Sequence, residues 1–133
     1  MIIGIHHIAI SVENLDTAVS FYQNAFGFEV VQTSDFNKNK LVDAAIGLTD
    51  AEARMAMLKA PNAFVELWEY VHPQPKDLRS RPCDYGYPHF ALQVSNIDDE
   101  YDRLIKAGMT FAGEVVHFTK ETAAIYGRDP FGN

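Results

Sequence analysis

One stretch of the chain occurs twice, and this repeat constrains the fold more than any other feature. Residues 6–16 read HHIAISVENLD and residues 88–98 read PHFALQVSNID, with His7 and His89 at equivalent positions. In both copies apolar residues alternate along the segment, which is typical of a strand with one buried face. The chain is therefore predicted to contain two similar halves, each beginning with a strand that leads into a helix.

The first half continues with this helix and three more strands. Asn14 can cap the helix, and Gly27 lies where a left-handed residue would end it. A polar turn is predicted over residues 35–40, and the weakly patterned residues 41–48 are predicted to form either a strand or a loop. Strands are predicted where β-branched and aromatic residues gather, over residues 28–32, 52–59 and 63–71.

The second half repeats this order as far as the chain extends. Ser95 or Asn96 can cap a helix that ends at Gly108. Strands are predicted over residues 109–118 and 122–126. The predicted fold is therefore α+β, with two paired βαβββ modules, helices outside the sheet, and the last strand of the second module missing. A Gly-Asn turn normally leads into another strand, so the chain is expected to be incomplete after Asn133.

Both modules are predicted to belong to one domain, residues 1–133. Residues 73–86 carry three prolines, several charges and a glycine, which is typical of a linker. The first module is therefore predicted over residues 1–72 and the second over residues 87–133.

Composition excludes several classes of function. The net charge of −7 argues against partners such as nucleic acid and an anionic membrane surface, because both attract basic proteins. Cys83 is the only cysteine, so the chain has no internal disulfide and a reducing compartment is expected. No apolar run is long enough to span a membrane, and the N-terminus lacks the features of a signal peptide. A cytoplasmic protein is predicted.

The repeated histidines indicate a metal site. If the halves pair about a pseudo-twofold axis, the imidazoles of His7 and His89 face one cavity. Two neutral imidazoles and a carboxylate suit a divalent transition metal. Alternation places the neighbouring His6 on the opposite face, although a shift of one residue in register would exchange His6 and His7.

Glu66 is the candidate carboxylate. It lies among apolar residues of a predicted strand, where burial without a partner is costly, and a metal or a substrate proton would provide that partner. The alternative is an edge-strand glutamate that faces water. Glu69 is a weaker candidate because it falls on the opposite face. Phe64, Trp68 and Tyr70 share the face of Glu66 and either line an apolar pocket or form ordinary core.

Four segments resemble the vicinal oxygen chelate superfamily, which includes glyoxalase I, methylmalonyl-CoA epimerase, extradiol dioxygenases and bleomycin-resistance proteins. The segments occur in the family's order and span nearly the whole chain. They are HHIAISVENLDTAVSFYQNAFGFEV, FVELWEY, YPHFALQVSNIDDEYDRLIKAG and GRDPFGN.

This resemblance implies a cup-shaped mixed sheet around a divalent metal ion. The resemblance does not distinguish between Zn, Ni, Co, Mn and Fe. The family's ligands come from the first and last strand of each module, and those positions hold His7, Glu66 and His89. The fourth ligand position would be a glutamate shortly after Asn133, in the usual GNxxEL ending. A protein of this type often works as a homodimer.

The resemblance also narrows the chemistry. In glyoxalase-like and epimerase-like members the metal polarises a carbonyl, and a carboxylate at either the Glu66 position or the C-terminal ligand position moves a proton. We therefore predict a lyase, isomerase or epimerase acting on a small-molecule substrate, with Glu66 as catalytic residue. One alternative is a non-catalytic protein that binds an antibiotic or a metabolite. The other is an Fe(II) extradiol-type dioxygenase, in which Glu66 would not be a ligand.

Overall fold

The computed structural model describes the whole chain, from Met1 to Asn133. The chain forms two compact units, Met1–Leu78 and Arg79–Asn133. Neither unit contains a helix that is both long enough and apolar enough to cross a lipid bilayer.

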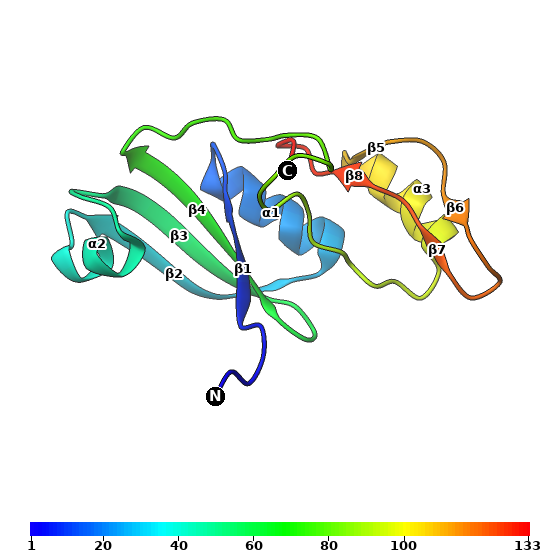
Figure 1. Ribbon diagram of the computed structural model, residues 1–133, viewed down its shortest axis with the longest axis horizontal. Coiled ribbons are helices and arrows are strands. Elements are labelled where there is room, and N and C mark those ends of the chain that lie inside the picture. Colours follow the sequence, from blue (N-terminus) through cyan, green and yellow to red (C-terminus); the bar gives the residue numbers. More distant parts are fainter. The chain divides into compact units, whose positions relative to one another are not determined.

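The first unit is a four-stranded sheet with a helix on one face (Figure 1). Its strands lie in the order β1–β4–β3–β2, in which β1 is parallel to β4 and the other neighbours are antiparallel. The element order confirms the predicted βαβββ pattern, with one additional short helix, α2. The elements are β1 (His7–Ser11), α1 (Leu15–Phe26), β2 (Glu29–Asn37), α2 (Lys40–Ile46), β3 (Glu52–Lys59) and β4 (Phe64–His72).

The core of this unit lies between α1 and the sheet. Tyr22 of α1, Leu58 of β3 and Leu67 of β4 are its largest fully buried side chains. Burying one such side chain contributes about 1.5–3 kcal/mol, so these contacts hold α1 on this face. Along β1, Ile8 and Ile10 are half-buried whereas the alternating polar and small residues are exposed, as the sequence predicted.

Side-chain caps set the ends of α1. The Asn14 side chain accepts a hydrogen bond from the Thr17 backbone N–H, and Gly27 ends the helix with a φ of 69°. Only glycine adopts this left-handed conformation without a steric cost. Both predicted caps are confirmed.

Two features between β2 and β3 differ from the prediction. The stretch predicted as a strand or a loop contains the helix α2, because the Asn39 side chain accepts from the Leu41 and Val42 backbone N–H groups and starts a helical turn. The predicted polar turn over residues 35–40 is partly strand, since β2 stays paired with β3 as far as Asn37. In Figure 1, α2 lies beyond the ends of these two strands.

The second unit contains one helix and two short strand pairs. Helix α3 (Ile97–Ala107) is capped by Asn96, which decides between the two predicted caps, and it ends at Gly108 as predicted. The strands predicted over residues 109–118 and 122–126 are much shorter in the structure. The pairs are β5 (Thr110–Phe111) with β8 (Gly127–Arg128), and β6 (Val116–His117) with β7 (Ala123–Ala124).

The predicted strand that begins the second half is not formed. Residues 88–94 adopt no regular structure, although they repeat the pattern of β1. In the first unit β1 forms its ladder with β4, whereas no strand of the second unit pairs with residues 88–94. A strand requires a partner for its backbone groups, so the alternating pattern alone does not produce one.

The last six residues form a turn that side-chain hydrogen bonds stabilise. The buried Asp129 carboxylate accepts hydrogen bonds from the backbone N–H groups of Phe131 and Asn133. Arg128 donates to the Gly132 carbonyl, and Arg79 donates to the Phe131 carbonyl. These bonds hold residues 128–133 in a turn.

Candidate metal site

His7 and Glu66 lie on the same face of the first unit's sheet. In the parallel register Ala9 is opposite Glu66, and His7 is two residues before Ala9. Residues two apart on a strand share a face. This face lies opposite α1, and we call it the site face; it carries His7, Ala9 and Ser11 of β1 with Phe64, Glu66, Trp68 and Tyr70 of β4. His7 Nε2 lies 3.6 Å from Glu66 Oε2.

The Glu66 carboxylate is held by Trp68. The indole Nε1–H of Trp68 donates to Glu66 Oε2 over 2.6 Å. The Glu66 side chain is 13% exposed, so it is largely removed from water. A hydrogen bond to a charged acceptor is stronger than one between neutral groups, and this one fixes the orientation of the carboxylate.

The Trp68 ring that donates this hydrogen bond lies in a stack of three aromatic rings. The Trp68 ring lies parallel to Phe36 of β2, with centroids 5.4 Å apart, and to Tyr70, with centroids 5.3 Å apart. Trp68 also forms a buried cluster with Ala53 and Met55. Trp68 is therefore packed core with Tyr70 packed against it, which is the second of the two alternatives, and the Trp68 ring also contacts Glu66.

The electrostatics of Tyr70 reflect this environment. Burial raises the pKa of the Tyr70 phenol, and the nearby negative charge of Glu66 raises that pKa further. Both effects disfavour an additional negative charge. The site face therefore presents one carboxylate in surroundings that favour neutral or positively charged groups.

Glu69 lies on the opposite face of β4, as predicted. Its Oε2 accepts a hydrogen bond from the Leu15 backbone N–H at the start of α1, over 2.6 Å. Arg54 lies 3.6 Å from the same oxygen and also pairs with Asp16 at 2.7 Å. Glu69 therefore stabilises the N-terminus of α1, where a negative charge is favourable.

Arg54 is a residue that sequence reasoning missed. Its hydrogen bond lowers the pKa of the Asp16 carboxyl below its usual value. The signal was a single charged residue between the apolar Ala53 and Met55 of a strand, which places Arg54 on the α1 face.

His6 does not simply point away from His7. Its Nδ1 lies 2.8 Å from His7 Nδ1, and its ring stacks on Phe64 with centroids 5.2 Å apart. The strand β1 begins at His7, so strict alternation does not apply to His6.

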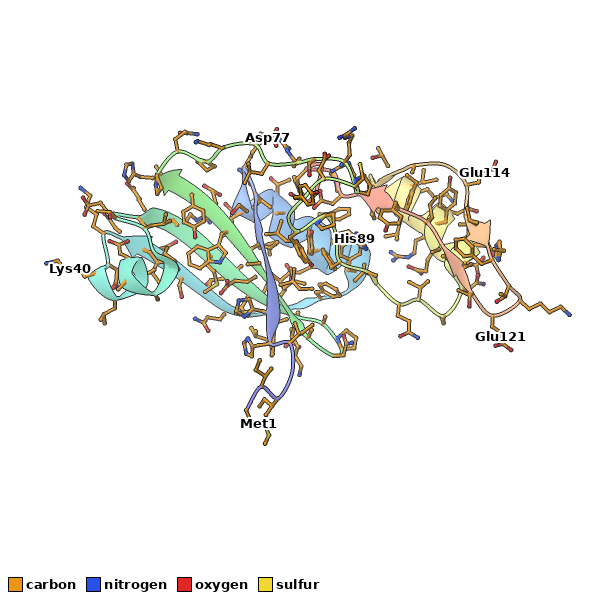
Figure 2. The ribbon with its side chains drawn as sticks, viewed as in Figure 1. Met1, Lys40, Asp77, His89, Glu114 and Glu121 are labelled. Carbon is orange, nitrogen blue, oxygen red and sulfur yellow. The ribbon has the colours of Figure 1, made fainter.

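His89 belongs to the second unit, in the segment that precedes α3 (Figure 2). Its Nε2 lies 3.5 Å from the Tyr126 hydroxyl, and the two rings meet edge to face with centroids 4.8 Å apart. His89 thus has one aromatic neighbour in its own unit. His117 of the same unit pairs with Asp98 at 3.1 Å, and both side chains are exposed.

The first unit brings together two of the three predicted metal ligands, His7 and Glu66. No group of three or more His, Cys, Asp or Glu side chains that could hold a metal ion is assembled. The two donors on the site face are nonetheless a suitable pair. Ligand atoms about 2.1 Å from a tetrahedral Zn²⁺ lie roughly 3.4 Å from each other. The distance of 3.6 Å between His7 Nε2 and Glu66 Oε2 is close to that spacing.

The fold and this pair define a class of protein: an α+β protein with a βαβββ unit that carries a histidine and a carboxylate on the face opposite its helix. The model of the Glyoxalase/Bleomycin resistance protein/Dioxygenase superfamily matches residues 4–133. The chain belongs to this superfamily, as its sequence motifs predicted.

Individual relatives include proteins of different activity. A 2-epi-5-epi-valiolone epimerase from Actinomyces sp is 36% identical over 104 residues, which cover 72% of this chain and 54% of the epimerase. The chain thus spans about half the length of that relative. The metallothiol transferase FosB from Shouchella clausii is 29% identical over an alignment that covers 100% of this chain and 77% of FosB.

A solved structure shows the same fold. The crystal structure of a glyoxalase family protein from Bacillus cereus superimposes with a TM-score of 0.89 at 26% sequence identity. The match covers 99% of this chain and 90% of that protein. It confirms the predicted α+β fold with a mixed sheet.

Proposed function

We propose that this protein is a metal-dependent enzyme that transfers a proton next to a carbonyl group of a small-molecule substrate. The observation that carries the proposal is the pair formed by His7 and Glu66, whose side chains lie 3.6 Å apart on one face of the sheet. A neutral imidazole and a carboxylate are donors that divalent transition metals accept. His7, Glu66 and His89 are the proposed ligands.

A bound divalent ion would supply Lewis acidity, which polarises a carbonyl oxygen and makes the neighbouring C–H more acidic. Glu66 is suited to move that proton. Its Oε2 accepts from Trp68 and lies beside His7 Nε2, so Oε2 is the oxygen proposed to bind the ion, and no protein group donates a hydrogen bond to Oε1. Oε1 is therefore the proposed proton acceptor. The Glu66 side chain is largely removed from water, which strengthens electrostatic effects at the carboxylate.

The relatives support this class of reaction without identifying the substrate. Similarity to an epimerase favours proton abstraction and return at one carbon, and similarity to a metallothiol transferase favours a metal-dependent activity. We therefore propose lyase, isomerase or epimerase chemistry. We also propose that the protein is a homodimer, which sedimentation analysis would detect as twice the chain mass.

The second candidate is a protein that binds an antibiotic or a metabolite and catalyses no reaction. One observation favours it, because no complete group of three ligands is assembled. The two candidates differ in their need for metal, since a binding protein of this kind would bind its ligand equally well in EDTA.

The experiment measures metal content and metal affinity. Protein purified without chelator is analysed by mass spectrometry for Zn, Ni, Co, Mn and Fe, and Zn²⁺ affinity is then measured for His7→Ala, His89→Ala and Glu66→Gln. Each variant is expected to bind Zn²⁺ more weakly. Matched controls are His72→Ala in the first unit and His117→Ala in the second, which should bind like the wild type.

One result would contradict the proposal. If the wild type contains no metal and gains no thermal stability from any of the five ions, the enzyme hypothesis fails and the binding hypothesis takes its place.

A further inference from the structure

We propose that His6 is a positioning residue that holds the His7 imidazole with its Nε2 available to a metal ion. This inference rests on the proposed function, because it assigns His7 as a ligand. It concerns a residue that strand alternation had placed on the opposite face.

The His7 imidazole has one polar neighbour at each nitrogen. His6 Nδ1 lies 2.8 Å from His7 Nδ1, which is a hydrogen-bonding distance. On the other side of the ring, His7 Nε2 faces Glu66 Oε2 at 3.6 Å. The two nitrogens of His7 are therefore divided between a partner histidine and the candidate metal site.

This division matches the needs of a metal-binding imidazole. The nitrogen that binds the ion must offer its lone pair, so the other nitrogen carries the proton and requires an acceptor. When His7 Nε2 binds an ion, its Nδ1–H donates to His6 Nδ1. His6 thereby selects the tautomer of His7 and fixes the plane of its ring.

His6 is itself held in place. Its ring stacks on Phe64, with centroids 5.2 Å apart and an angle of 26° between the planes. Phe64 is the residue opposite His7 in the β1–β4 ladder, and its backbone N–H donates to the His6 carbonyl. The acceptor nitrogen is therefore placed by the same pair of strands that places His7 and Glu66.

Two substitutions of His6 distinguish the effect of its Nδ1 acceptor from the effect of its stacking on Phe64. His6→Phe keeps an aromatic ring on Phe64 but removes the Nδ1 acceptor. His6→Asn loses the ring but places an amide oxygen near the position of Nδ1. Because His6 is exposed, both variants are expected to fold, and their melting temperatures without metal check this.

Zn²⁺ affinity is measured by competition with a chromophoric chelator. We expect His6→Phe to bind Zn²⁺ about 10–100-fold more weakly than the wild type, which is the usual effect of removing the partner of a ligating histidine. We expect His6→Asn to keep wild-type affinity. In nitrogen-15 NMR spectra of the Zn²⁺-loaded wild type, His7 should show a protonated Nδ1 that exchanges slowly with water, and in His6→Phe this proton should exchange faster.

Each of the other possible outcomes would contradict the inference about His6. If His6→Phe binds Zn²⁺ like the wild type while His7→Ala does not bind it, the inference is wrong and the proposed function stands. If both His6 variants lose affinity equally, the aromatic ring rather than the acceptor positions His7, and the inference is again wrong. If the wild type binds no metal, the proposed function fails and this inference fails with it.

Discussion

The hydrogen bond between Trp68 and Glu66 provides a quantitative test of how the candidate base is held. We consider Trp68→Phe, Glu66→Ala and the double variant. The bond is 2.6 Å long, Trp68 is 8% exposed and the Glu66 side chain is 13% exposed. Hydrogen bonds to charged groups contribute about 1.5–3 kcal/mol, and burial places this one within that range. Each variant should lower the free energy of unfolding. The sum of the losses in the two single variants should exceed the loss in the double variant by about 1.5–3 kcal/mol, which is the coupling energy of the pair.

The assay is urea unfolding followed by far-UV circular dichroism. EDTA is present throughout, so bound metal does not contribute to stability. Trp68 is the only tryptophan, so its fluorescence is lost in two of the four proteins and does not serve as a common probe. A control cycle combines Trp68→Phe with Glu29→Ala at the distant start of β2, and these changes should add to within about 0.5 kcal/mol.

A Trp68–Glu66 coupling no larger than that of the control cycle would contradict this expectation. Glu66 would then be held by the shape of its surroundings, and the proposal that Trp68 reserves Oε2 and leaves Oε1 for proton transfer would have no energetic basis.

Three further predictions concern the first unit. Glu66→Gln should lower the pKa of Tyr70 but leave it above its usual value, because burial is the larger cause of the rise. An absorbance titration at alkaline pH measures this pKa, with Tyr70→Phe as the reference that identifies the Tyr70 signal. An unchanged pKa would contradict the prediction. Leu67→Ala should lower the free energy of unfolding in urea by about 2–5 kcal/mol, since Leu67 is fully buried under α1, and a loss below about 1 kcal/mol would be inconsistent with that packing. The pKa of Asp16 is lowered by Arg54, so its stabilising effect is complete above the unfolded-state pKa and is lost as pH falls through the folded-state pKa. The difference in melting temperature between Arg54→Met and the wild type should accordingly be constant from pH 7 down to about pH 4 and shrink below that pH, and a difference that persists at lower pH would show that this ion pair is not involved.

Features that depend on near neighbours in the chain were predictable from the sequence alone. Alternation in residues 7–11 predicted which side of β1 is buried, and Asn14 and Gly27 predicted both ends of α1. The repeat and the four motifs were sufficient for the superfamily, which the match over residues 4–133 confirms. These signals succeed because periodicity and helix capping are local properties.

The tertiary structure decided what depends on partners distant in the sequence. Residues 88–94 carry the pattern of β1 but form no strand, because no strand of the second unit pairs with them. The pairing of β1 with β4 brings His7 to Glu66, and the stack on Phe64 turns His6 towards His7. A pattern in the sequence states which face a residue prefers, but strand register and the packing of neighbouring side chains determine which groups meet there.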